Sequence, residues 1–434
     1  MFPSSCFRAV EKSQTLVINE QSRQLEASGR EVFKFGFGQS PFPPLPAAVA
    51  ELQAQAHQKA YAPTQGIPEL REAVAAFHRD AENLDVTAEQ VIVGSGSKIL
   101  IYAAMAAFTH ADVLIPAPAW VSYVPQAKLL GHTPIRVVSH FEGRWRMTPE
   151  ALLASIAQKE NPSTPSILIF NHPGNPDGLC YTDEELTELA SVMRANNILA
   201  ISDEIYGLLH HTGGHKSLAL FYPEGTIVTG GLSKWCGAGG WRLGVALLPR
   251  SLGVGESEFK NVMTGISSET YSCAPLPIQL AAVKAYHWQS PELQVYLRHQ
   301  RKLISFLGTW CAKTLRDEAG IRVHTPQGGF YLFIDFTPFQ DLLVQKHKFA
   351  SSGAMCQALL VDTGVAVLPA NAFGMDNDYM AARLAFVEFN GADALAAAAK
   401  LGDDVPIPEE EFLSTVFAKT AKGIRSIVEW TKKL

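Results

Sequence analysis

The chain has 434 residues, of which 47% are hydrophobic and 18% are charged, a composition typical of a folded globular protein rather than a disordered chain. One hydrophobic core seldom supports so many residues, so we expect two domains, or one large domain with additions. A formal net charge of −6 provides no basic surface for nucleic acid or for an anionic membrane, and neither is expected as a partner.

The cysteines and the first residues indicate the compartment. No cysteine belongs to a C-x-x-C pair, which argues against zinc-ribbon and thioredoxin-like sites and predicts reduced thiols; the six are Cys6, Cys180, Cys236, Cys273, Cys311 and Cys356. Residues 1–14 contain no apolar stretch typical of a secretory signal, and the longest apolar run, residues 99–108, is too short to cross a bilayer. We therefore expect a cytoplasmic protein without a metal site.

In chain order, residues 1–45 begin with a possible helix and continue into a Gly/Pro-rich segment, residues 33–46, that cannot be helical throughout. Helical patterns follow over residues 46–59 and 69–82, with the turn YAPTQGIP between them. The second of these helices carries acidic residues in its first turn, as the helix dipole favours.

Seven short runs rich in β-branched residues come next, most of them separated by helical stretches, up to about residue 290. Continuous apolar strands that alternate with helices predict a largely parallel sheet covered on both faces. The runs are residues 91–96, 112–116, 134–138, 166–171, 198–204, 226–231 and 242–248.

A long helical pattern over residues 290–315 follows and is suited to joining two domains. Beyond it, the strand-like residues 330–336, 365–369 and 382–389 mix with helices, and a helix-like tail begins at Glu409 and closes with Lys433. We predict an α/β protein whose large domain, residues 46–290, contains a mostly parallel seven-stranded sheet. Residues 1–45 and 291–434 are predicted to form a smaller α+β domain.

Polar segments directly follow four of the apolar runs, at residues 94–98, 171–177, 203–206 and 230–234. Ligands of parallel sheets bind beyond the carboxyl ends of the strands, so these segments predict one composite site. The first of them, in VGSGSKIL, exposes backbone N–H groups at the start of a helix and suits a phosphate. It lacks the spacing of a P-loop and the third glycine of a dinucleotide motif, and taken alone it is better explained as a plain strand-to-helix turn.

Two further strand ends carry candidate side chains. Asn175 lies between Gly174 and Pro176, which fixes its backbone and aims its amide, although turn formation alone explains the same residues. Asp203 ends an apolar strand, with Tyr206 three residues on. A carboxylate there either meets a cation, such as the ring nitrogen of a pyridine cofactor, or is a solvated helix cap.

The segment GGLSKWCGAGGWRLG is the most informative. Lys234 and Ser233 stand in a glycine-rich turn, and Arg242 follows eight residues later. A lone lysine is usually a surface residue, and Arg242 alone fits an ordinary strand-end charge. Together they offer an amine nucleophile beside a guanidinium, which binds phosphate through two hydrogen bonds.

GGLSK followed by Gly-Trp-Arg-Leu-Gly resembles the Schiff-base segment of the class I/II aminotransferases, enzymes of the aspartate-aminotransferase-like fold type I that use pyridoxal 5'-phosphate (PLP). The resemblance extends over most of the chain, because eight further segments, five before and three after this one, occur in the order of that family. They are YAPTQGIPELREAVA, GSGSK, PAPAWVSY, HPGNPDG, SDEIY, QGGFYLF, GVAVLPANAFG and ARLAF.

The resemblance implies roles for individual residues. Lys234 would bind PLP as a Schiff base and carry the proton, Asp203 would pair with the pyridine nitrogen, and Asn175 and Tyr206 would hydrogen-bond the phenolic oxygen. The phosphate would be held by Gly96, Ser97, Lys98, Ser233, Arg242 and, across a homodimer interface, by Tyr61 of the neighbouring subunit. Trp120 would stack on the ring, and Arg383, helped by Gly38 and Asn175, would bind the substrate carboxylate.

Several of these positions keep an alternative interpretation. Trp120 and Tyr61 fit plain core or interface aromatics, and the segment around Gly38 matches the family only approximately. The turn around Asn175 departs from the family's usual Ser-Pro-Asn-Asn-Pro-Thr-Gly at His172, Gly174 and Asp177. Because Asn175 itself is present, the departure does not affect the predicted cofactor binding. It indicates an unusual substrate specificity.

The resemblance predicts transfer of an amino group between an L-amino acid and a 2-oxo acid by a ping-pong mechanism in a homodimer with shared active sites. A PLP-dependent β-lyase, or another α-carbon enzyme of the same fold, is the alternative, since it would share Lys234, Asp203 and Arg242. A transcription regulator with an aminotransferase-like domain is disfavoured, because the family-like region begins near residue 33 and the net charge is acidic.

Overall fold

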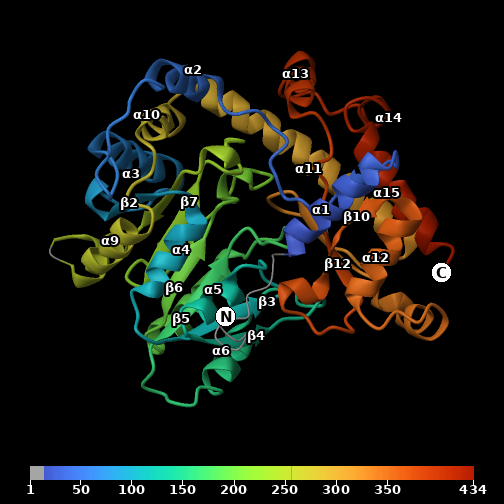
Figure 1. Ribbon diagram of the computed structural model, residues 1–434, viewed down its shortest axis with the longest axis horizontal. Coiled ribbons are helices and arrows are strands. Elements are labelled where there is room, and N and C mark those ends of the chain that lie inside the picture. The colour runs from blue at the N-terminus through green and yellow to red at the C-terminus, as the bar shows by residue number, and fades with distance from the viewer. Residues whose placement is uncertain (1–13, 256) are drawn as a thin grey trace, which may run out of the picture.

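A computed structural model describes residues 14–255 and 257–434 of the chain (Figure 1). Its largest sheet has seven strands in the order β2-β8-β7-β6-β5-β3-β4, and all of them run parallel except β8, which is antiparallel to both of its neighbours. The strands are β2 (Val91–Gly94), β3 (Asp112–Ala117), β4 (Thr133–Val138), β5 (Ser166–Asn171), β6 (Leu199–Asp203), β7 (Thr226–Gly231) and β8 (Gly244–Leu247). The predicted mostly parallel seven-stranded sheet is confirmed.

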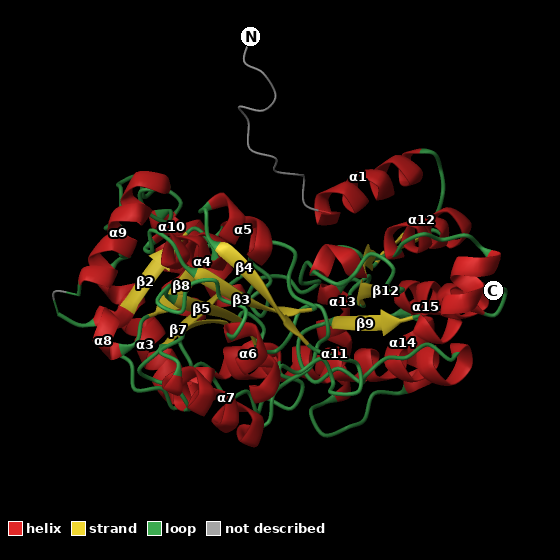
Figure 2. Cartoon of the chain, turned by 90° about the horizontal axis from the view of Figure 1, so that it is seen from below, coloured by secondary structure: helices red, strands yellow, loops and turns green. Residues whose placement is uncertain are grey.

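Helices cover both faces of this sheet (Figure 2). They are α4 (Ser97–Ala106), α5 (Tyr123–Leu129), α6 (Pro149–Ile156), α7 (Asp183–Ala195), α8 (Arg250–Gly253) and α9 (Glu258–Thr270). Side chains alternate along a strand, so Ile167 and Ile169 of β5 pack under α4 and α5, whereas Leu168 and Phe170 pack under α6 and α7.

Two predicted helices precede the sheet, α2 (Pro46–Gln55) and α3 (Pro68–Glu82), and α10 (Leu276–Ala285) packs against both. Each of the first two begins at a proline, which has the backbone angle of a first helical turn and leaves no N–H without a partner there. Leu70, Val74 and Phe77 form the buried face of α3.

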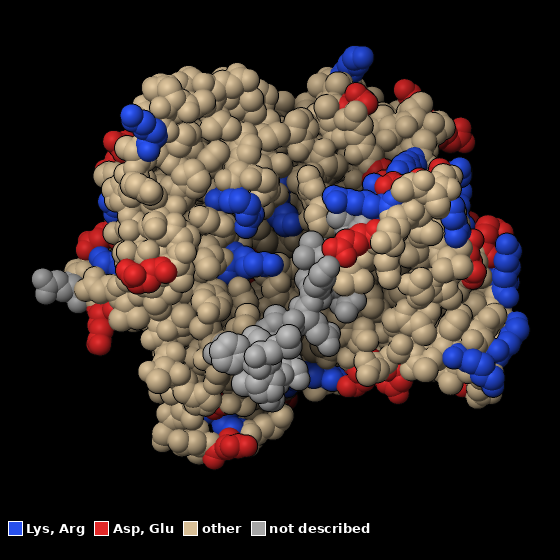
Figure 3. Space-filling view, viewed as in Figure 1, with Lys and Arg blue, Asp and Glu red and all other residues tan. Residues whose placement is uncertain are grey.

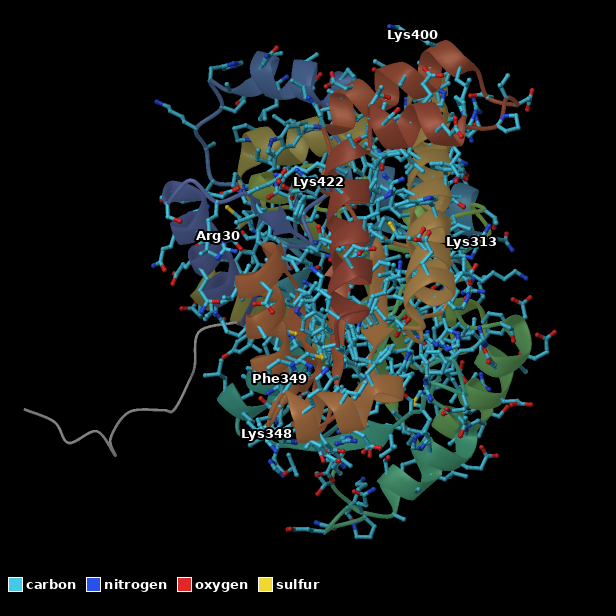
Figure 4. All side chains as sticks on the ribbon, turned by 90° about the vertical axis from the view of Figure 1, so that its right-hand side faces the viewer. Arg30, Lys313, Lys348, Phe349, Lys400 and Lys422 are labelled. Atoms are coloured by element: carbon cyan, nitrogen blue, oxygen red, sulfur yellow. The ribbon has the colours of Figure 1, made fainter. Side chains whose placement is uncertain are left out.

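The predicted long helix is α11 (Pro291–Ala319), which Ser290 caps at its start and Gly320 ends in a left-handed conformation. It leads into the C-terminal part of the molecule, where it lies beside α15 (Ala418–Thr431) (Figures 1 and 4). Charged residues recur along α11, and no helix in residues 14–255 and 257–434 is long and apolar enough to cross a membrane.

The C-terminal part contains a three-stranded antiparallel sheet, ordered β11-β12-β9, and the helices α12 (Ser352–Thr363) and α13 (Gly391–Leu401). Its strands are β9 (Tyr331–Asp335), β11 (Leu368–Pro369) and β12 (Ala381–Ala385). The N-terminal segment, with α1 (Gln14–Ala27) and β1 (Phe33–Lys34), joins this part, because β1 pairs with β10 (Val365–Ala366) and Lys422 of α15 forms an ion pair with Glu31. The division of the chain into domains at residues 46 and 290 stays a prediction.

Three predicted elements differ from the structure. The run 365–369 is two strands, β10 and β11, because its halves pair with β1 and β12 respectively. The C-terminal tail is two helices, α14 (Glu409–Ser414) and α15, since the chain turns at Thr415 so that Phe412 and Phe417 are both buried. The run that was predicted to open at Arg242 becomes a strand only at Gly244.

Candidate active site

A cavity of about 540 Å³ lies where the edge of the large sheet meets the N-terminal segment and the C-terminal part. Lys and Arg side chains, blue in Figure 3, gather around a hollow in the middle of the face shown there. Eleven of the predicted site residues line the cavity: Gly38, Ser97, Lys98, Trp120, Asn175, Asp203, Tyr206, Ser233, Lys234, Arg242 and Arg383.

The sheet topology explains why these residues meet. The parallel strands β5, β6 and β7 end at the same edge. Asp203 is the last residue of β6, and Asn175 and Lys234 follow the ends of β5 and β7 by four and three residues. Strand β8 runs in the opposite direction, so the residue that precedes it, Arg242, lies at this edge as well. Ser97 begins the helix that follows β2.

Lys234 is half-buried, and its Nζ donates a hydrogen bond to the backbone oxygen of Gly38 at 2.6 Å. The same nitrogen lies 5.6 Å from the centre of the Tyr206 ring and 5.9 Å from that of Phe330. Gly231, at the end of β7, has a φ of +155°, and a Cβ there would lie 2.6 Å from the backbone oxygen of Leu243. The turn that carries Lys234 therefore needs a glycine at this position.

Asp203 is not a solvated strand end, because only 4% of it is exposed. Its Oδ2 accepts a hydrogen bond from the Tyr123 hydroxyl at 2.7 Å, and its Oδ1 accepts one from the backbone N–H of Ile205 at 3.4 Å. Burial raises the pKa of this carboxyl to about 6 despite these donors. A buried carboxylate held by neutral donors is stabilised by a cation, and a protonated pyridine nitrogen is such a cation.

Tyr206 and Asn175 meet in a second group of contacts. The Tyr206 hydroxyl lies 2.9 Å from the hydroxyl of Tyr331 and accepts a hydrogen bond from Asn175 Nδ2 at 3.5 Å. Asn175 is held in turn by Asn171, whose Oδ1 accepts from the Asn175 N–H at 2.7 Å. Burial and the neighbouring Tyr331 raise the pKa of Tyr206 well above its ordinary value.

Arg383 lies on β12 with 2% of its surface exposed. Its Nη1 donates to Asn175 Oδ1 at 3.1 Å and its Nη2 donates to the Gly36 backbone oxygen at 2.8 Å. Its Nε is buried and has no hydrogen-bond partner in the part of the chain that the structure describes, and burial lowers the pKa of the guanidinium. A buried cation without a carboxylate partner suits an anionic ligand such as a substrate carboxylate.

A second group of positive charges surrounds the start of α4. Arg242 donates to the backbone oxygens of Gly239 and Ser95 at 2.9 and 3.4 Å. Burial, helped by Arg242 and Lys234, lowers the pKa of Lys98. Asp203 is the only acidic side chain among the described residues that line the cavity, and it interacts electrostatically with Lys234. Lys98 and Arg242 form no ion pair with a carboxylate of the described residues, so they fit the phosphate group of PLP.

Three predicted residues offer no side chain to the cavity of a single chain: two are glycines and the third is an exposed tyrosine. Gly96 does not line the cavity, but a Cβ there would lie 2.3 Å from Arg242 Nη2, so its missing side chain gives the guanidinium room. Gly38 faces the cavity, and a Cβ there would lie 1.9 Å from the Tyr331 hydroxyl. Tyr61 is 92% exposed and lies outside the cavity of a single chain.

Three residues that the sequence did not single out belong to the site: Tyr123, Asn171 and Tyr331. Tyr123 and Tyr331 lie in the family-like segments PAPAWVSY and QGGFYLF. The polar hydroxyl of a tyrosine within a largely apolar motif is the sequence signal that could have identified them. The cation–π contact of Lys98 with Trp120, at 4.8 Å from the ring centre, was not foreseen either.

Comparison with known proteins settles the family. Residues 30–387 match the protein family described as Aminotransferase class I and II. The chain belongs to this family. The predicted resemblance and fold are therefore confirmed, and members of the aspartate-aminotransferase-like group depend on PLP, which Lys98, Arg242 and the buried Asp203 carboxylate accommodate.

Two relatives illustrate the similarity. The aspartate aminotransferase of Bacillus sp. (strain YM-2) is 33% identical over 372 residues, which cover 83% of this chain and 89% of that protein. The aspartate/prephenate aminotransferase of Cereibacter sphaeroides is 31% identical and covers 87% of this chain and 93% of its own. Among solved structures, the aspartate aminotransferase of Thermus thermophilus with maleate superposes with a TM-score of 0.79 at 26% identity, over 92% of this chain and 98% of that one.

Proposed function

We propose that this aminotransferase moves the amino group of an L-amino acid to a 2-oxo acid by a ping-pong mechanism, with aspartate as the first donor to test. The convergence of Lys234, Asp203 and Arg383 in one cavity carries the proposal, because it brings together an amine, a buried carboxylate and a buried cation. Aspartate is favoured because both relatives compared above carry it in their names.

PLP, when bound, draws electrons away from the α-carbon of an amino acid, and the protein supplies the groups that bind and orient both molecules. Lys234 Nζ would attach the cofactor covalently and, once released by the substrate amine, would move the proton from the substrate's α-carbon as base and then acid. Its place beside the Gly38 backbone oxygen restrains this amine between the N-terminal segment and Tyr206.

Asp203 would keep the pyridine nitrogen protonated, and Tyr123 would orient its carboxylate. Asn175 and Tyr206 would hydrogen-bond the phenolic oxygen, and Trp120 would lie against the ring.

The phosphate would be bound by Ser97, Lys98, Ser233 and Arg242, with Gly96 leaving space for the guanidinium. Arg383 would bind the α-carboxylate of the substrate, beside Asn175 and the Gly38 backbone.

Steady-state kinetics test the proposal. With aspartate and 2-oxoglutarate varied together, double-reciprocal plots should give parallel lines, and each half-reaction should proceed alone with one equivalent of product per site. Release of ammonia and a 2-oxo acid from one amino acid, with no need for an acceptor, would instead show a lyase. A panel of the other amino acids as donors, run in the same assay, identifies the preferred substrate.

We also propose a homodimer in which Tyr61 completes the phosphate site of the partner subunit, since this tyrosine is 92% exposed in a single chain. Sedimentation of the holoenzyme should show a dimer, and Tyr61→Phe should weaken PLP binding about tenfold, equal to about 1.4 kcal/mol, while leaving the dimer intact. PLP dissociation from the two proteins, followed by dialysis and absorbance, measures this. A fully active monomer would rule the shared site out.

The five described cysteines are all free, which supports the proposal that the enzyme works in the cytoplasm; Cys6 lies outside the described residues.

A further inference from the structure

A buried ion pair lies directly behind the turn that carries Asn175. Arg146, in the loop between β4 and α6, approaches Asp177 with Nη2 and Oδ1 2.5 Å apart, and their side chains are 4% and 5% exposed. Both residues are absent from the site proposed above. A small cavity of about 20 Å³ is lined by both of them and by Asn175, so the pair and this active-site residue border one space.

Both members of the pair make further contacts with the backbone and side chains around them. Arg146 also donates from Nε to the Arg144 backbone oxygen at 3.0 Å and from Nη1 to the Leu179 backbone oxygen at 3.2 Å, and its guanidinium lies 4.6 Å from the centre of the Tyr181 ring. The Asp177 carboxylate accepts the Leu179 N–H at 2.7 Å. Both charges therefore hold the backbone of one residue, Leu179.

Contacts of this ion pair explain why the turn departs from the family pattern at Gly174 and Asp177. A Cβ on Gly174 would lie 2.4 Å from Asp177 Oδ1, so a glycine is needed where the carboxylate folds back over the turn. Gly174 also exchanges backbone hydrogen bonds with Leu179 and Gly178, both at 3.0 Å. Gly174 and Asp177 thus form one unit that closes the turn around Asn175.

The loop on the other side of the pair is held in an unfavourable conformation. Arg144 and Trp145, immediately before Arg146, both have φ near +57°, which side chains with a Cβ seldom adopt. Such conformations persist only where the surrounding structure enforces them, and here they bring Arg146 to Asp177.

We propose that Arg146 and Asp177 are a positioning pair that fixes the Asn175 amide and, through its 3.1 Å hydrogen bond, the Arg383 guanidinium, and so sets the affinity for the substrate carboxylate. This inference rests on the proposed function, since it concerns the carboxylate subsite of that reaction. Neither residue contacts a reacting atom, so both act through Asn175.

The test compares holoenzyme variants by their affinity for α-methyl-L-aspartate, which has the substrate carboxylate but no α-proton, and by the KM and kcat for aspartate. Asp177→Asn and Arg146→Met each should raise the dissociation constant and the KM about tenfold and change kcat less than about threefold. Arg383→Lys, made in parallel, gives the effect of disturbing the carboxylate subsite directly.

The double variant R146M/D177N separates positioning from stability. Each single variant leaves one buried charge without its partner and should lower the melting temperature, whereas the double variant leaves none and should regain it. If the pair positions Asn175, the KM of the double variant stays high although its stability returns. A KM that returns together with the melting temperature would show a merely structural pair and overturn the inference.

Glu185→Gln is the matched control. Glu185 forms the neighbouring, half-exposed ion pair with Arg144 at 2.5 Å and makes no hydrogen bond or ion pair with Arg146, Asp177 or Asn175 in the part of the chain that the structure describes, and a glutamine can replace it at the start of α7. Its KM and melting temperature should equal those of the wild type. Turnover of the wild type in the same assay tests the proposed function separately, so an active wild type with unchanged single variants would refute only the positioning role.

Discussion

Replacing Lys234 by alanine is expected to abolish transamination, with kcat reduced by at least about four orders of magnitude, because one amine both attaches the cofactor and moves the proton. No other lysine can take its place: Lys98 is the only other lysine among the described residues that line the cavity, and it is the second residue of α4, at the proposed phosphate site. Lys234→Arg keeps the positive charge beside Gly38 but removes the nucleophilic amine. It should be equally inactive, which would show that activity requires the amine and not only its charge.

Three measurements check this result. Borohydride treatment of the wild-type holoenzyme should fix the cofactor to a single peptide that contains Lys234 and remove the visible absorbance band. The alanine variant should still bind PLP without a covalent bond, and added small primary amines should restore part of the proton transfer. Labelling of a different lysine, or an alanine variant with ordinary turnover, would refute the assignment.

Much of this site could be predicted because it depends on strand ends. Apolar runs with polar residues directly after them specify a parallel sheet and the edge at which those residues meet, so the sequence alone predicts that Asp203 and Lys234 lie together. The antiparallel direction of β8 was not foreseen from its apolar pattern, yet it is what brings Arg242 to the same edge.

Contacts between distant segments could not be predicted in the same way. Tyr331 reaches Tyr206 and the Gly38 backbone from the C-terminal part, and Arg146 meets Asp177 from another loop. No local period or motif encodes such pairs, because they depend on how whole elements pack. The end of α14 is a similar case, since the burial of Phe417 overrides a helical pattern that continues through the sequence.

Asp203 illustrates how the site exchanges stability for function. We expect Asp203→Asn to lower kcat/KM by at least about a hundredfold, because an amide cannot keep the pyridine nitrogen protonated. In the cofactor-free protein the same change should be stabilising at pH 7.5. The carboxyl is buried and accepts only neutral donors, so its charged form is disfavoured when no cation is bound.

The raised pKa of Asp203 determines how the stability of the cofactor-free protein depends on pH. A pKa of about 6 in the folded protein, against an ordinary value of 3.8, means that the native state binds this proton more tightly than the unfolded chain. The group therefore stabilises the cofactor-free protein below about pH 4, and that contribution is lost as the pH rises through 6. A shift of about two units corresponds to up to about 3 kcal/mol, which Asp203→Asn should recover at pH 7.5 but not at pH 4.

Urea unfolding of cofactor-free wild type and variant between pH 4 and pH 8 measures the difference directly. The two free energies of unfolding should converge at low pH and separate through pH 6, with the variant the more stable above it. Adding PLP should reverse the order, because its cationic ring nitrogen compensates the carboxylate of the wild type alone. Equal stabilities at pH 7.5, or a wild type that is the more stable without cofactor, would mean that burial does not disfavour the Asp203 carboxylate in the cofactor-free protein.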